Sequence, residues 1–117
     1  MVILFFIRKQ LFLIKEINLI KHIAMYELRK YHGNRVQSLT YDDGKLSFSV
    51  GIMSPGEYEF GSIKKEAFTV IQGSISSWFD GESNWKTAKQ NEKFSIPEHK
   101  NFKLKANEVS AYICYYQ

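Results

Sequence analysis

Apolar and polar residues alternate with a period of two along most of the chain after residue 34. This period places successive side chains on opposite faces of an extended strand. Leu46, Phe48 and Val50 share one face of such a segment, and Ser47 and Ser49 share the other. The pattern predicts a protein built from β-strands.

Glycine, next to aspartate or proline, divides this region into short segments. The turns fall at residues 43–44, 54–56 and 80–81. Eight strands are expected, at residues 35–41, 45–53, 57–60, 68–73, 74–79, 92–97, 101–106 and 109–116. No helical pattern follows residue 32. Short strands at even spacing predict an all-β fold, either an antiparallel sandwich or a barrel.

The first 24 residues follow a different pattern. Leu13, Ile17, Ile20 and Ala24 recur at helical spacing, which predicts a short amphipathic helical extension over residues 1–24. The domain itself is expected over residues 25–117. The extension holds four basic residues and one acidic residue, so most of the net charge of +4 lies there.

Three interpretations of the extension remain open. It is an amphipathic helix that lies on a membrane or on the domain, an appendage that docks in an oligomer, or sequence upstream of a true start at Met25. A transmembrane span is not expected, because the apolar run of residues 2–7 is too short and Arg8 and Lys9 follow it. A signal peptide is not expected either, because no basic segment precedes the apolar run.

Composition and charge narrow the function of the domain. The chain of 117 residues suffices for one modest core, and its 44% hydrophobic residues argue against wholesale disorder. The nearly neutral domain shows no basic stripe, so neither a nucleic acid nor a membrane is expected as its partner. Cys114 is the one cysteine, which excludes an internal disulfide and fits a cytoplasmic location.

Several short motifs then occur in a fixed order. They are Gly51-Ile52-Met53, Gly56-Glu57-Tyr58 with Phe60, Thr69-Val70-Ile71 closed by Gly73, and Pro97 with Phe102. Together they make residues 31–117 resemble the small cupin-like family of pyrimidine/purine nucleoside phosphorylases. The resemblance implies a cupin-like double-sheet roll or barrel and a homodimer. It also implies phosphorolysis of nucleosides, with inorganic phosphate as co-substrate and no other cofactor.

Metal-binding cupins carry a His-x-His pair and a later histidine, and this chain does not. Glu57 and Glu59 stand where the pair is expected, and Phe102 stands at the last histidine position. Transition metals favour imidazole nitrogen ligands. We therefore expect no metal site, and we interpret the domain as a metal-free cupin.

Phosphorolysis needs a proton donor for the leaving base, and three residues are candidates for catalysis. They are Glu57, Glu66 and His99. Each of them also fits an ordinary surface or structural position, so the residue types alone do not decide.

Phosphate needs a cationic ligand, for which Arg35 is the candidate, and the base needs an apolar wall. The wall candidates are the aromatic residues Tyr58, Phe60, Phe102 and Tyr112. Relatives place an arginine shortly after the cysteine of the last strand, whereas here Tyr115 follows Cys114. If that arginine binds phosphate in relatives, this chain needs another donor. The alternative function is a non-catalytic, metal-free cupin that binds a small metabolite.

Overall fold

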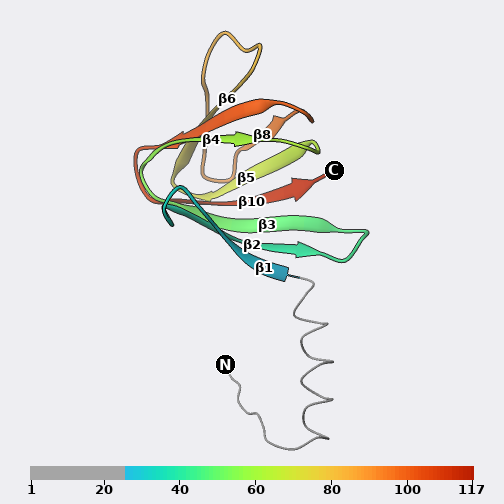
Figure 1. Cartoon of the computed structure of the whole chain (residues 1–117). Coiled ribbons are helices and arrows are strands. Elements are labelled where there is room, and N and C mark those ends of the chain that lie inside the picture. Colours follow the sequence, from blue (N-terminus) through green and yellow to red (C-terminus); the bar gives the residue numbers. More distant parts are fainter. Residues whose placement is uncertain (1–25) are drawn as a thin grey trace, which may run out of the picture.

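The computed structural model describes residues 26–117, and the ten strands in this part form two antiparallel sheets (Figure 1). The strands are β1 (Tyr26–Tyr31), β2 (Val36–Asp42), β3 (Ser47–Met53), β4 (Gly56–Gly61), β5 (Glu66–Gln72), β6 (Ser74–Phe79), β7 (Lys86–Lys89), β8 (Lys93–Ile96), β9 (Asn101–Ala106) and β10 (Ser110–Tyr116). The larger sheet has the order β1-β2-β3-β10-β5-β8, and the smaller one has the order β4-β9-β6-β7. The predicted all-β, double-sheet architecture is confirmed.

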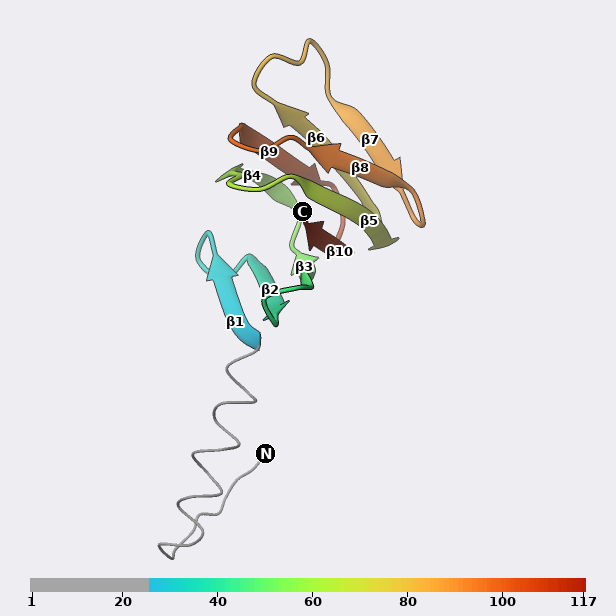
Figure 2. The ribbon, with the colours of Figure 1, turned by 90° about the vertical axis from the view of Figure 1, so that its right-hand side faces the viewer.

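The eight expected strands are all present, and β1 and β7 are additional. In Figure 2, β6 and β7 lie at one end of the molecule and β1 and β2 at the other. β1 pairs with β2 along its whole length, from Tyr26 opposite Tyr41 to Tyr31 opposite Val36. The helix expected at residues 1–24 lies outside the described residues. Among residues 26–117, no helix has the length and apolar character needed to cross a membrane.

Aliphatic and aromatic side chains from both sheets form the core. Met53, Val70, Ile75 and Leu104 are almost fully buried there, together with Ile96. Burial of such side chains is the main favourable term in folding. Val36 on β2 and Met53 on β3 belong to the same core, so the core extends to one end of these two strands.

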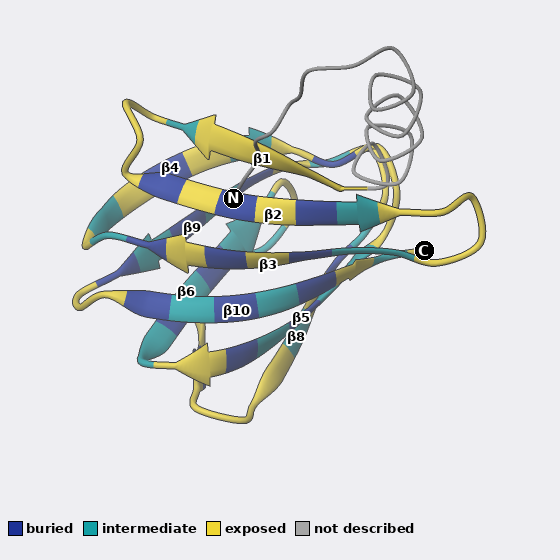
Figure 3. Cartoon of the chain, turned by 90° about the horizontal axis from the view of Figure 1, so that it is seen from below, coloured by how far each residue is buried: buried dark blue, intermediate teal, exposed yellow. Residues whose placement is uncertain are grey.

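Beyond Val36 and Met53, which belong to the core, the inner face of β2 and β3 is polar. Ser38, Thr40 and Ser49 are buried, while Leu39 and Ile52 are 49% and 58% exposed on the opposite face. Figure 3 shows this alternation of burial along both strands. The period of two in the sequence predicted these strands correctly, but it did not reveal that their hydroxyl groups point inward.

The opposite side of the larger sheet, called here the outer face, is mostly apolar and almost uncharged. Its side chains stand in cross-strand rows because the strands pair in register. The rows contain Tyr26, Tyr41, Phe48, Tyr115, Ala67 and Ser95; Leu28, Leu39, Val50, Ile113, Thr69 and Lys93; and Lys30, Gln37, Ile52 and Ala111. The described residues in these rows include two lysines, at the two edge strands, and no acidic residue.

Candidate functional site

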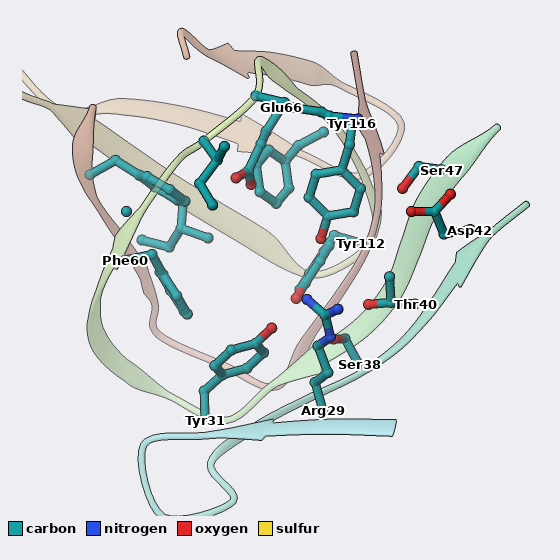
Figure 4. A pocket seen from close by; sticks show the side chains of 16 residues that line it. Arg29, Tyr31, Ser38, Thr40, Asp42, Ser47, Phe60, Glu66, Tyr112 and Tyr116 are labelled. Atoms are coloured by element: carbon teal, nitrogen blue, oxygen red, sulfur yellow. The ribbon is translucent and has the colours of Figure 1, made fainter. Parts of the chain in front are cut away.

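A cavity of about 470 Å³ opens into the interior between the two sheets (Figure 4). Its volume lies in the range that accommodates a small organic ligand. The lining residues come from β1, β2, β3, β4, β5, β9, β10 and the connection between β4 and β5: Arg29, Tyr31, Ser38, Thr40, Asp42, Ser47, Phe60, Gly61, Ile63, Lys64, Glu66, Phe68, Phe102, Leu104, Tyr112 and Tyr116.

Aromatic rings form one side of the cavity. Phe60 on β4 and Phe102 on β9 face each other across paired strands, with ring centroids 5.5 Å apart and an angle of 27° between the planes. Phe68 on β5 meets Phe102 edge to face at 6.5 Å. A planar ring entering from the mouth therefore finds an apolar surface here.

Hydroxyl groups form the opposite side. Ser49 Oγ lies 2.7 Å from Thr40 Oγ1 and 2.7 Å from the Tyr116 hydroxyl, so the three groups make one hydrogen-bonded chain across β2, β3 and β10. Two hydrogen bonds use two of the three hydroxyl hydrogens. The third forms no hydrogen bond with another described residue and is free to donate to water or a ligand.

The ring of Tyr112 lies directly against the backbone of Gly51. A Cβ atom at residue 51 would stand 2.3 Å from Tyr112 Cζ, so only glycine fits beneath the ring. Burial raises the pKa of Tyr112, and it also raises the pKa of Tyr116. Both phenols therefore stay protonated at neutral pH and can donate hydrogen bonds into the cavity.

Glu66, the first residue of β5, brings a carboxyl group into the cavity. Burial raises its pKa to about 7, against the opposing effect of a hydrogen bond from Cys114. That hydrogen bond is weak, because the thiol donates to Oε1 over 3.7 Å. A carboxyl group with this pKa can give up a proton and take it back near neutral pH.

Arg29 brings a cationic group to the cavity from the edge strand β1. Its Nη2 donates to Glu27 Oε1 at 2.9 Å, and this hydrogen bond raises the pKa of the guanidinium. Figure 4 shows that polar ends from several strands converge on the interior: those of Arg29, Tyr31, Glu66, Tyr112 and Tyr116. The site thus combines an acid, a cation and phenolic donors opposite an apolar wall.

The model of the family described as "Pyrimidine/purine nucleoside phosphorylase" matches residues 26–116, which is nearly all of the described domain. This chain belongs to that family. A pyrimidine/purine nucleoside phosphorylase from Pseudomonas putida is similar to it, with 33% identity over 93 residues, covering 80% of this chain and 99% of the relative.

Solved structures show the same fold. A protein of unknown function from Vibrio parahaemolyticus has a TM-score of 0.74 at 33% identity, covering 79% of this chain and 98% of its own. A cupin superfamily protein from Desulfitobacterium hafniense has a TM-score of 0.60 at 13% identity, covering 77% and 81% of the two chains. The family fold in this chain is therefore cupin-like, as expected from the sequence.

The structure brings together four of the site residues that were expected from the sequence. Glu66, Phe60, Phe102 and Tyr112 all line the cavity. They come from β4, β5, β9 and β10, so residues up to 52 positions apart in the sequence share one cavity. Their roles in binding and catalysis remain predictions.

Glu57 and His99 lie outside the cavity. Glu57 is exposed on β4, and its Oε2 is 3.9 Å from Nζ of the cross-strand residue Lys103. His99 is exposed in the turn before β9, where its Nε2 is 3.2 Å from Glu98 Oε2. Both side chains are exposed to solvent, so the structure does not bring these two candidates into the cavity.

Arg35 and Tyr58 also lie outside the cavity and hold the turn between β3 and β4. Arg35 donates from Nε to the Tyr58 hydroxyl at 3.2 Å and from Nη2 to the Pro55 carbonyl at 2.6 Å. The buried Tyr58 donates in turn to the Ser54 carbonyl at 2.8 Å. These contacts hold both residues at the turn, and neither lines the cavity.

Sequence reasoning missed Arg29 because β1 was not expected. One signal was available: a strand over residues 26–31 places Glu27, Arg29 and Tyr31 on one face. Tyr115, by contrast, lies on the outer face and is 40% exposed. A phosphate ligand at residue 115 would therefore point away from the cavity.

Side chains that could bind a metal ion are widely spaced in the described part of this chain. Within residues 26–117, no three His, Cys, Asp or Glu side chains gather closely enough to hold a metal ion. Glu57 and Glu59 are exposed on β4, and Phe102 is buried against the aromatic wall.

Proposed function

We propose that this protein is a metal-independent nucleoside phosphorylase, a pentosyltransferase that converts purine and pyrimidine nucleosides and phosphate to free base and pentose 1-phosphate. One observation carries the proposal: in a chain of this family, a carboxyl group with a pKa of about 7 shares a cavity with a pair of facing aromatic rings. An acid and a base-stacking surface are what cleavage of a glycosidic bond to a nucleobase requires.

Phe60 and Phe102 are the proposed wall for the nucleobase. Every nucleobase has a π face that can stack on an aromatic ring, whatever its pattern of hydrogen-bonding groups. This side of the cavity contacts the face of the base and not the hydrogen-bonding groups along its edge. The same site therefore accepts both purines and pyrimidines.

The hydroxyl chain across β2, β3 and β10 is the proposed partner of the pentose. Thr40 and Tyr116 line the cavity at the two ends of the chain, and Ser49 connects them. Hydroxyl groups both donate and accept, which suits the hydroxyls of a sugar. The pentose then lies between the base wall and the cation of Arg29.

The chemical step needs no group beyond these residues and phosphate. An oxygen of hydrogen phosphate forms a bond to C1′ while the bond from C1′ to the base nitrogen breaks, and its electron pair leaves with the base. Protonated Glu66 gives its proton to the base. The proton that phosphate loses on becoming an ester returns to Glu66, so the enzyme ends as it began.

Metal independence is part of the proposal. Its support is the loss of all three histidines of the metal-binding cupin pattern, together with the exposed positions of Glu57 and Glu59. Protonation of the base by Glu66 replaces the Lewis acid that a metal ion would supply. The reaction belongs to nucleoside salvage, which fits the cytoplasmic location expected from the sequence.

The test is release of free base from a panel of nucleosides, with and without phosphate, in the presence of a chelator. We expect release from uridine and inosine that requires phosphate and survives the chelator. Release that stops with the chelator would overturn metal independence. No release by folded protein, with nucleosides still raising its unfolding temperature, would favour the metabolite-binding cupin instead.

A further inference from the structure

The proposed reaction needs a cationic ligand for phosphate, and two lining residues carry a cation. Arg29 comes from β1, and Lys64 comes from the connection between β4 and β5. Arg35, the arginine expected for this role from the sequence, is bound within the β3–β4 turn. Arg35 does not line the cavity, which leaves Arg29 and Lys64 as the candidates for the phosphate ligand.

We propose that Arg29 binds the phosphate co-substrate at the mouth of the cavity, with the Tyr31 hydroxyl as a second donor and Glu27 as the group that limits phosphate affinity. The assignment rests on the proposed function, since phosphorolysis is the reaction that calls for phosphate here. It adds Arg29, its strand β1 and the neighbouring carboxylate of Glu27 to the proposed site.

The guanidinium of Arg29 has donors to spare. It carries five N–H groups, and the hydrogen bond to Glu27 occupies Nη2. The remaining planar edge matches two oxygens of a phosphate, a geometry that a lysine ammonium does not offer. Figure 4 shows the guanidinium directed into the cavity, on the same side as the hydroxyl of Tyr31.

Tyr31 stands two residues beyond Arg29 on the same face of β1, so both side chains point inward. Both residues line the cavity, and Figure 4 shows their polar ends directed toward its interior. A phenol beside a guanidinium can turn its O–H toward an anion bound to both groups. Tyr31 also packs edge to face on Phe60, with ring centroids 5.6 Å apart, which fixes its ring against the base wall.

Glu27 opposes the anion. Its Oε1 is 2.9 Å from Arg29 Nη2, and the two side chains are 63% and 45% exposed. An exposed ion pair is weak, and a phosphate dianion competes well for the same cation. The negative charge of Glu27 nevertheless lies beside the bound phosphate, so its removal should strengthen phosphate binding.

The test compares four variants of the full chain by phosphate titration, one of which, Lys64→Gln, removes the other cation that lines the cavity. Arg29→Gln removes the proposed ligand, and Glu27→Gln removes the opposing charge. Lys30→Gln is the matched control, because Lys30 follows Arg29 on β1 but lies on the outer face. Each variant is measured twice: as the KM for phosphate at saturating uridine, and as calorimetric binding of inorganic phosphate alone.

We expect Arg29→Gln to raise the KM for phosphate about tenfold or more, since it removes charge-assisted hydrogen bonds, while the KM for uridine stays nearly constant. Glu27→Gln should lower the KM for phosphate, and Lys30→Gln should leave it unchanged. The calorimetric affinities should follow the same order.

Equal phosphate affinity in Arg29→Gln and Lys30→Gln would overturn the assignment, even if the protein is an active phosphorylase. Loss of affinity in Lys64→Gln with none in Arg29→Gln would also overturn it and move the ligand to Lys64. If the wild-type chain shows no phosphorolysis but binds phosphate, and Arg29→Gln does not bind it, the proposed function fails while the anion site stands.

Discussion

At the scale of single residues, burial separates carboxyl groups that the sequence makes look alike. Glu57 and Glu66 both lie in strands among aromatic and aliphatic neighbours. Glu57 faces Lys103 and solvent, whereas Glu66 lies in the cavity with a thiol as its one described hydrogen-bond donor. A poorly hydrated carboxyl group holds its proton more tightly, and this difference alone suits Glu66 to act as an acid.

The variant Glu66→Gln tests that role. It keeps the shape and removes the proton, so we expect kcat to fall about a hundredfold or more, as for loss of a general acid. In the wild-type protein kcat should fall as the pH rises through about 7, because the pKa of Glu66 is raised to that value and the deprotonated form cannot protonate the base. A pH–rate profile of both proteins measures this, and the descending limb should be absent from the variant.

Glu57→Gln is the matched control, since it makes the same chemical change on the exposed side of β4. Its kcat should stay within about twofold of the wild-type value, as expected for an exposed group. An equal loss of rate in both variants would argue against Glu66 as the acid.

The sequence predicted four of the residues that line the cavity but not which carboxyl groups are buried. Phe60, Phe102, Tyr112 and Glu66 were predicted as site residues, and all line the cavity. The sequence could not separate Glu66 from Glu57, because exposure depends on which sheet covers each strand. That information resides in the packing of the two sheets and not in the period of two.

At the scale of elements, side chains fix the connection from β3 to β4. Arg35 at the start of the hairpin strand β2 and Tyr58 on β4 meet through one hydrogen bond, and both bind carbonyls of the intervening turn. Gly56 adopts φ of 151° there, and a Cβ atom at this residue would stand 2.7 Å from the Tyr58 hydroxyl. The hydroxyl oxygen of Tyr58 therefore links Arg35 to the backbone of the turn.

Tyr58→Phe should lower the free energy of unfolding by about 1–2 kcal/mol, because Arg35 Nε loses its acceptor and the Ser54 carbonyl loses its donor. Activity should remain near the wild-type value, since Tyr58 does not line the cavity. Urea unfolding and the base-release assay measure the two effects. Loss of activity at unchanged stability would return Tyr58 to the site.

The strands in which buried and exposed residues alternate were predicted from the sequence. The strands without this alternation were missed. β1 is exposed at five of its six residues, and β7 at three of four, so neither shows a buried apolar face. Each exists because a neighbouring strand offers a free edge: β1 pairs with β2, and β7 pairs with β6. Missing β1 also meant missing Arg29.

At the scale of the whole molecule, the outer face leaves several large apolar side chains exposed, among them Leu39 at 49% and Ile52 at 58%. Exposed apolar patches of this kind mark interaction sites in soluble proteins. We propose that a second copy covers the outer face, because two outer faces stacked on each other bring together rows without acidic residues and leave the lysines at the edges. The extension at residues 1–24 is less suited, because its surplus of positive charge meets no acidic partner on this face.

We therefore expect the full chain to sediment at close to twice its mass of 13.7 kDa. Leu39→Lys adds a charge within an apolar row of the outer face, so it should shift the equilibrium toward the monomer. It should not unfold the protein, because Leu39 is already half exposed. Sedimentation equilibrium at several concentrations measures both. A wild-type chain that stays monomeric at every concentration would contradict this expectation.

The contact between Tyr112 and Gly51 limits which mutations the two positions can accept during evolution. Any side chain at residue 51 collides with the phenol ring, so a mutation there is tolerated only after Tyr112 has been exchanged for something smaller. We therefore expect the two positions to change together, although 60 residues lie between them in the sequence. Lineages that retain this tyrosine in the cavity are bound to retain the glycine on the neighbouring strand.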